Sequence, residues 1–163
     1  MTELHSLRDR ANAYASSREP TVTLGDQLGI GNDGTVWSSD RNTAIKVFER
    51  PNNYSRELGC YERLANRRIH SINGFKIPRL VNHSAGLHVV ETTIVQPPYL
   101  LDFGKAYLDT SPDFTPEVLG DWEAEKSALY EPGEWPIVMQ LLAQLQALGI
   151  YYFDAKPANI SFG

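Results

Sequence analysis

The pattern of hydrophobic and polar positions divides the chain into a β-rich first part and a helical second part. Residues 3–18 place leucines, alanines and a tyrosine at helical intervals before Pro20, which predicts a leading helix. Short runs of alternating or β-branched residues follow at 21–30, 34–40 and 42–50, and Gly, Asn and Asp residues separate them. These runs predict three antiparallel strands.

The same pattern then predicts one helix and two further strands. Residues 54–69 carry apolar side chains on one face at helical spacing, with charged residues around the rest, so an amphipathic helix follows the three strands. The strand-like runs at 77–86 and 87–95 are joined by a Ser-Ala-Gly turn. Together these elements predict a five-stranded sheet with one helix.

Beyond the pair Pro97 and Pro98 the pattern is helical, and this pair is the best candidate for a boundary between two lobes. Residues 115–130 begin with Thr-Pro, a typical helix start. Residues 135–149 are apolar on most faces and end in glycine, which predicts a buried helix with a glycine stop. The chain is therefore expected to be α+β.

Composition narrows the class of protein. The 163 residues are 42% hydrophobic and 21% charged, as expected for one globular domain, and the net charge of -5 argues against non-specific nucleic-acid binding. Cys60 is the only cysteine, which excludes an intramolecular disulfide and suits a reducing compartment. No run approaches the roughly 18 apolar residues of a membrane span. We expect a soluble cytoplasmic protein that binds neither nucleic acid nor membrane.

A glycine pattern provides the first candidate chemistry. In LGIGNDGTVW, residues 28–37, Gly29, Gly31 and Gly34 form G-x-G-x-x-G, and Val36 follows where it can lie over a flat base. Such glycines also form ordinary hairpin turns, so the pattern alone does not assign a phosphate site. A dinucleotide fold would open a helix at the third glycine, whereas β-rich sequence continues here. A strand-turn-strand flap fits better.

Lys46 lies inside an apolar strand, where an unpaired ammonium is costly to bury. One interpretation is an edge-strand lysine that extends its charge to water. The other is a pair with Glu57 on the following helix, which would present the lysine to the α- and β-phosphates of a nucleotide.

The order of these motifs resembles that of the protein kinase superfamily. GIGNDGTV is similar to the glycine-rich loop, AIK at 44–46 to the strand-three lysine motif, and RELGCYERL at 56–64 to the helix that carries the partner glutamate. YFDAKPAN at 152–159 resembles the catalytic loop H-R-D-x-K-x-x-N. The resemblance covers about residues 24–162. It implies a reduced protein-kinase-like fold with a five-stranded antiparallel N-lobe, one helix and a minimal helical C-lobe.

This resemblance implies a single kinase-like domain over residues 1–163. Residues 1–20 would form the leading helix, 21–97 the N-lobe and hinge, and 98–163 a rudimentary C-lobe with the catalytic-loop-like segment. The hinge is expected near Glu91 to Pro97. A nucleotide would bind between the lobes.

The resemblance also implies roles for individual residues. Asp154 would orient the attacking hydroxyl or accept its proton, Lys156 would stabilise the γ-phosphoryl group, and Asn159 would hold magnesium. Asp154 could instead cap a turn, and Asn159 could satisfy loop backbone. The implied cofactors are ATP and magnesium. The implied nucleotide-binding residues are Leu28, Gly29, Ile30, Gly31, Asn32, Asp33, Gly34, Thr35, Val36, Ala44, Lys46, Glu57 and Glu91.

The sequence also departs from the family pattern. Tyr152 and Phe153 replace the His-Arg pair, so the arginine that usually clamps a phosphorylated activation loop is missing. The family's D-F-G metal motif follows the catalytic loop, but here only four residues follow Asn159. The tripeptide 102–104 does read D-F-G, yet it precedes the catalytic loop, so chain order predicts that it lies outside the magnesium site. Asp102 is expected to be a solvated or capping carboxylate, or else to approach a ribose hydroxyl.

Three functions remain open from the sequence. One is a minimal ATP-dependent phosphotransferase acting on a hydroxyl acceptor, and another is a nucleotide-binding pseudokinase or regulatory module with little transfer. The third is an interaction scaffold without nucleotide, which the retained polar cleft residues disfavour. Because the second metal carboxylate is missing from the expected place, the isolated chain is predicted to bind ATP but to transfer phosphate slowly. The sequence identifies neither the acceptor nor a protein partner.

Overall fold

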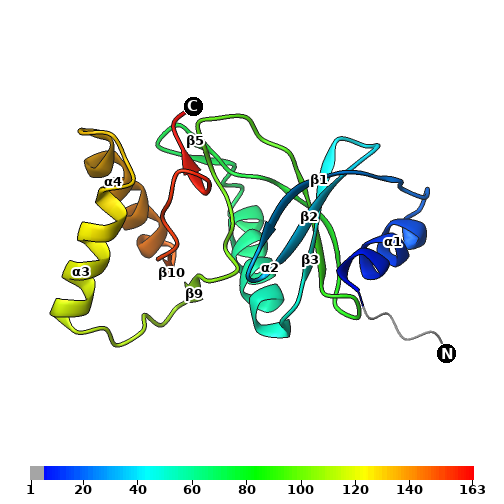
Figure 1. The fold of residues 1–163 in the computed structure, drawn as a ribbon, viewed down its shortest axis with the longest axis horizontal. Coiled ribbons are helices and arrows are strands. Elements are labelled where there is room, and N and C mark those ends of the chain that lie inside the picture. Colours follow the sequence, from blue (N-terminus) through cyan, green and yellow to red (C-terminus); the bar gives the residue numbers. More distant parts are fainter. Residues whose placement is uncertain (1–5) are drawn as a thin grey trace.

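A five-stranded antiparallel sheet forms the centre of the computed structural model, which describes residues 6–163 (Figure 1). The strand order is β1-β2-β3-β7-β6, and every neighbouring pair is antiparallel. The strands are β1 (Leu24–Gly31), β2 (Gly34–Ser39), β3 (Thr43–Phe48), β6 (Leu80–Ser84) and β7 (Val89–Thr93). Four of them fall within the runs that the alternation predicts, and β1 ends one residue beyond its run; the α+β class is confirmed.

The leading helix packs on one face of this sheet. Helix α1 (Leu7–Ser17) begins after Ser6, whose side chain accepts a hydrogen bond from the Asp9 amide at 3.0 Å and caps the helix. The predicted start, at residues 3–5, lies outside the described residues. Apolar side chains of α1 form a small core with the inward positions of the strands. That core consists of Ala11, Tyr14, Ala15, Val22, Trp37, Ile45, Val47 and Val89.

Helix α2 (Pro51–Asn66) lies on the opposite face of the sheet (Figure 1). It begins three residues before the predicted run, with Pro51 in the first turn, where a missing amide hydrogen costs nothing. Its buried face includes Cys60, which is fully buried, and also Glu57, a charged residue at an otherwise apolar position. This helix therefore carries a carboxylate into the interior.

Six short strands tie the second half of the chain to the first. Four of them form a second sheet in the order β11-β8-β5-β4, and the other two, β9 and β10, pair with each other. They are β4 (Ser71–Ile72), β5 (Phe75–Lys76), β8 (Tyr99–Leu100), β9 (Tyr107–Leu108), β10 (Ile150–Tyr151) and β11 (Ile160–Ser161). At two residues each they are too short to show a period of two, so the sequence does not predict them.

Two helices form the C-terminal part, α3 (Pro116–Ser127) and α4 (Glu134–Ala147). Helix α4 was predicted to be buried on most faces, and this prediction is wrong in part. Only Val138, Leu141 and Leu145 are buried, whereas Ile137 is 42% exposed. One stripe of α4 packs on the core and the other side faces solvent. None of the helices in residues 6–163 is long and apolar enough to cross a membrane.

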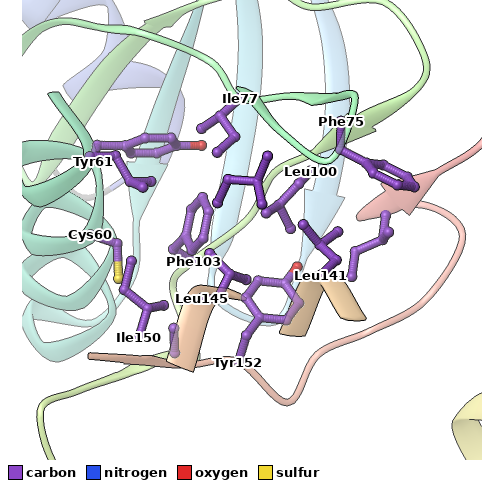
Figure 2. Packing of buried hydrophobic residues seen from close by; sticks show 14 of the residues in the cluster. Cys60, Tyr61, Phe75, Ile77, Leu100, Phe103, Leu141, Leu145, Ile150 and Tyr152 are labelled. Atoms are coloured by element: carbon purple, nitrogen blue, oxygen red, sulfur yellow. The ribbon is translucent and has the colours of Figure 1, made fainter. Parts of the chain in front are cut away.

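The larger hydrophobic core joins α2 to α4 across the centre of the molecule. Figure 2 shows Phe103 surrounded by side chains from α2, α4 and the last strands. Its ring makes edge contacts with Tyr61, at 5.2 Å between centroids, and with Tyr152, at 5.5 Å. Phe103 is fully buried. It therefore anchors the segment 101–104 between the two halves of the chain.

Candidate functional site

A cavity of about 590 Å³ lies between the β1–β2 hairpin, α2 and the segment 154–159. Its volume falls within the range of small-molecule sites. Most residues predicted for the site line this cavity. They are Leu28, Gly29, Ile30, Gly31, Asn32, Asp33, Gly34, Val36, Ala44, Lys46, Glu57, Asp154, Lys156 and Asn159.

Two of the predicted nucleotide-binding residues, Thr35 and Glu91, do not line the cavity. Successive side chains of a strand point to opposite faces, so Glu91 points away from its neighbours Val90 and Thr92, which do line it. The Glu91 side chain accepts hydrogen bonds from Tyr14 at 2.6 Å, Thr43 at 2.7 Å and Arg18 at 2.8 Å. The structure therefore does not bring the Glu91 side chain to the cavity, and the predicted nucleotide contact of this residue stays a prediction.

The glycine-rich segment is the strand-turn-strand flap that the sequence favours. Ile30 pairs with Thr35 and Gly31 with Gly34 at the end of the hairpin, so the turn overhangs the cavity. Gly34 has a φ of +157°, and a Cβ atom there would collide with the Val47 carbonyl oxygen on β3. Only glycine lets the hairpin lie this close to the next strand.

Three carboxylates surround the ammonium group of Lys46. Lys46 Nζ lies 3.3 Å from Glu57 Oε2, 3.1 Å from Asp33 Oδ2 and 3.2 Å from Asp102 Oδ1. It also lies 4.7 Å from the centroid of the Phe48 ring. The predicted pair between Lys46 and Glu57 is confirmed, and the ammonium is held inside the cleft rather than extended to water.

Burial and charge act against each other in this cluster. Burial lowers the pKa of Lys46, but attraction by Glu57, Asp102 and Asp33 outweighs burial and raises that pKa above its ordinary value of 10.5. Burial raises the pKa of Glu57 above its ordinary value of 4.5, although Lys46 opposes the change. One ammonium therefore faces more negative charge than it can neutralise.

Asp102 lies in the cleft, which contradicts the expectation from chain order. Besides its contact with Lys46, it lines the same cavity as Asp154 and Asn159. The next residue, Phe103, donates its backbone amide to Glu57 Oε1 at 2.9 Å. Asp102 has a φ of +71°, in the left-handed region that aspartate adopts more readily than most residues. The D-F-G tripeptide therefore sits beside the Lys46–Glu57 pair.

Strand pairing explains why chain order misleads here. Leu100 of β8 pairs with Ile160 of β11, and the Leu101 amide donates to the Asn159 carbonyl oxygen at 2.9 Å. The Tyr152 hydroxyl donates to the Leu101 carbonyl oxygen at 2.7 Å. The segment that follows β8 therefore lies directly beside the segment that precedes β11, although the two are far apart in sequence.

The catalytic-loop-like segment is held by its own hydrogen bonds. Asn159 Nδ2 donates to the Asp154 carbonyl oxygen at 2.9 Å and to Asp154 Oδ2 at 3.1 Å. Trp122 of α3 donates its indole N–H to the Phe153 carbonyl oxygen at 2.8 Å. These bonds fix the Asp154 backbone. The Asn159 side-chain oxygen takes part in none of them.

The donor set of the cavity suits magnesium. Magnesium prefers oxygen ligands and is usually held by one or two carboxylates together with phosphates and water. Asp102, Asp154 and Asn159 supply two carboxylates and one amide oxygen to one cavity. Among residues 6–163, no group of three or more His, Cys, Asp or Glu side chains is arranged to hold a metal ion by itself. These three residues could hold a magnesium ion only together with further oxygen ligands.

Sequence reasoning missed several lining residues besides Asp102. Leu101, Lys105 and the segment Thr92–Val95 also line the cavity. The D-F-G letters themselves are the available signal for Asp102, although their position before the catalytic-loop-like segment argues against a metal site. No comparable signal marks Lys105. Residues 92–95 fall within the hinge expected near Glu91 to Pro97, although none of them was among the predicted nucleotide-binding residues.

Comparisons with known proteins give a weak likeness. No protein-family model matches the chain, and no curated protein is significantly similar to it. Among solved structures, the streptomycin–ATP–APH(2")-IIa ternary complex matches with a TM-score of 0.39 and 19% sequence identity. The match covers 59% of this chain and 30% of the other, so the chain spans less than a third of that protein's length.

Proposed function

We propose that this chain binds magnesium and ATP in the cleft and transfers the γ-phosphoryl group to a hydroxyl acceptor. The observation that carries this proposal is the convergence on one cavity of the Lys46–Glu57 pair with Asp102, Asp154 and Asn159. These residue types at one site suit phosphoryl transfer, where catalysis is largely positioning and charge stabilisation.

Apolar and polar side chains both line the cavity. Val36, Ala44 and Leu101 would hold a flat base, while Lys46 would contact the phosphates. Glu57 keeps the lysine in place, because it is itself fixed by the Phe103 amide. Asp102 and Asn159 would hold the metal, which when bound offsets the charge of the phosphate oxygens.

Asp154 would act on the acceptor. Its carboxylate would orient the hydroxyl and accept its proton as the acceptor oxygen bonds to the γ-phosphorus. The bond from that phosphorus to the β–γ bridging oxygen then breaks, and ADP leaves. Lys156, which lines the same cavity, would stabilise the charge on the transferring group. The acceptor in this scheme is any hydroxyl that reaches Asp154.

The position of Asp102 removes the reason for expecting slow phosphate transfer. That expectation rested on a missing second metal carboxylate, and Asp102 is a carboxylate in the same cavity as Asn159. The alternative, a nucleotide-binding module with little transfer, has one observation in its favour: Lys46 is already engaged by Asp33 and Asp102. Measured transfer decides between the two.

Asp102→Asn and Asp154→Ala provide the test. Binding of ATP with magnesium is measured by calorimetry, and transfer to water by release of phosphate from γ-labelled ATP. Removing one preorganised electrostatic partner costs about a hundred- to a thousandfold in rate, so both variants should lose transfer by at least that amount. Asp121→Asn, a change at an exposed acid on α3, is the matched control.

Two results would contradict the proposal. A wild-type chain that binds no ATP with magnesium would remove its basis. Wild-type transfer rates in Asp102→Asn would mean that Asp102 has no role in the metal site. Binding without measurable transfer in the wild-type chain would favour the regulatory module.

A further inference from the structure

We propose that Asp33, in the turn of the glycine-rich hairpin, occupies the phosphate position at Lys46 and competes with the nucleotide's phosphates until it is displaced. This inference rests on the proposed function and adds a residue that sets how tightly polyphosphates bind. It follows from the position of the Asp33 carboxylate, from the charge around it and from a second cavity beside it.

The Asp33 side chain points inward, although it lies in a turn. Asp33 is only 7% exposed, whereas its neighbour Asn32 is exposed. Its Oδ2 atom makes the shortest of the three carboxylate contacts with Lys46 Nζ, at 3.1 Å. A carboxylate oxygen at this distance from a lysine is an anionic acceptor of the same kind as a phosphate oxygen.

The carboxylate also fits against Gly104. A Cβ atom at Gly104 would collide with Asp33 Oδ2, so the glycine provides the space that the carboxylate fills. The contact closes the hairpin onto the segment 102–104, on the opposite side of the cavity. Asp33 thus blocks the part of the cleft that lies between the glycine-rich turn and Asp102.

Asp33 is the carboxylate of the three that is best able to move. Glu57 is in a helix and accepts a hydrogen bond from the Phe103 amide. Asp102 lies between residues that are anchored by β8 and by the hydrophobic core. Asp33 lies in a two-residue turn. Added phosphate charge beside three carboxylates is unfavourable, so the phosphates and Asp33 should exclude each other at Lys46.

A second cavity offers the displaced carboxylate another cationic environment. This space, of about 410 Å³, is lined by Asn32, Asp33, Arg50, Asn53 and Lys105. Asp33 lines both cavities and so lies in the wall between them. Rotation outward would move its charge away from Lys46 and toward Arg50, which lines only the second cavity.

Asp33→Asn tests the competition, because it keeps the shape of the side chain and removes the charge. We expect ATP with magnesium to bind about tenfold more tightly to this variant than to the wild-type chain, since a charged hydrogen bond no longer has to be broken. Adenosine, which has no phosphates, should bind both chains equally. Asp26→Asn on β1, an exposed change of the same charge, controls for long-range electrostatics. Calorimetry measures all affinities, and thermal unfolding checks that each variant folds.

Arg50→Gln tests the outward position. In the wild-type background it should weaken ATP binding about threefold, because the displaced Asp33 loses a partner. In the Asp33→Asn background the same change should have no effect on ATP affinity. Equal effects of Arg50→Gln in both backgrounds would show that Arg50 acts on the nucleotide and not on Asp33.

The outcomes separate this inference from the proposed function. If the wild-type chain binds ATP and Asp33→Asn binds it equally or more weakly, the inference is wrong while the proposed function stands. If adenosine gains as much affinity as ATP, Asp33 acts on the whole hairpin and not on the phosphate position. If neither chain binds ATP, both ideas fail. Should Asp33→Asn not fold, Asp33→Ala carries the same expectation.

Discussion

Two buried charges lie on neighbouring strands of the central sheet and face opposite sides. Lys46 of β3 points into the cleft, and Glu91 of β7 points toward α1. The register sets this arrangement, because Lys46 pairs with Val90 while Glu91 pairs with Ile45, one residue further along. The two groups share one sheet and occupy opposite faces of it.

Their charged partners differ in number and sign. Glu91 accepts hydrogen bonds from Tyr14, Thr43 and Arg18, of which only the arginine is charged, so its one negative charge is balanced. Lys46 faces three carboxylates, so its one positive charge is outnumbered. A balanced buried charge holds elements together, whereas an unbalanced one has partners that a ligand can replace. By this reasoning we expect Glu91 to be structural and Lys46 to be functional.

The largest effect is expected from Glu91→Ala. Removing one partner of a buried, hydrogen-bonded charge typically costs about 3 kcal/mol or more, and here it leaves Tyr14, Thr43 and Arg18 without their acceptor. Urea denaturation should show this loss in the free energy of unfolding. ATP affinity of the folded variant should be unchanged. Glu49→Ala, at an exposed position just after β3, is the control. A loss below about 1 kcal/mol in the free energy of unfolding would contradict a structural role for Glu91.

Lys46→Ala should show the opposite pattern. ATP affinity should fall by about tenfold or more, because the phosphates lose their cation. The free energy of unfolding should change by less than about 1 kcal/mol, since no large cavity opens and the raised pKa of Glu57 lets that carboxyl take up a proton. Calorimetry and urea denaturation give the two values, with exposed Lys76→Ala as the control. Unaltered ATP affinity would remove Lys46 from the site.

The smallest effect is an acid dependence of the Glu91 cluster. Burial alone would raise the pKa of Glu91, but hydrogen bonds from Tyr14, Thr43 and Arg18 lower it below its ordinary value of 4.5. A depressed carboxylate pKa adds stability above the unfolded value, and that stability is lost as pH falls through the folded value. Glu91→Gln should therefore be less stable near neutral pH, yet lose less stability between about pH 5 and pH 3. Parallel curves for both chains would contradict this.

The central sheet and the Lys46–Glu57 pair could be predicted from the sequence, because each depends on elements whose hydrophobic pattern is long enough to detect. The five strands show alternation over five residues or more, and α2 shows a helical period with Glu57 at the position that the resemblance implies. The face of the sheet that Glu91 occupies could also have been predicted. Val90 and Thr92 are its neighbours in the strand, so Glu91 must point away from the face that they occupy.

The place of Asp102 could not be read from the sequence. It depends on β8 and β11, which have two residues each and no detectable period. The sequence showed the D-F-G letters but not the strand pairing that brings them beside Asn159. The order of the motifs along this chain therefore does not predict which of them lie side by side.

The pairing of β8 with β11 also sets the order in which the cleft can form during folding. Contacts between residues close in sequence form early, whereas pairing Leu100 with Ile160 requires the closure of a long loop. The hairpin, Lys46 and Glu57 all lie within residues 24–66 and need no such closure. As the chain emerges from the ribosome, the half of the cleft that holds Lys46 can therefore assemble first. The half that holds Asp102 and Asp154 is completed only when β11 has been synthesised.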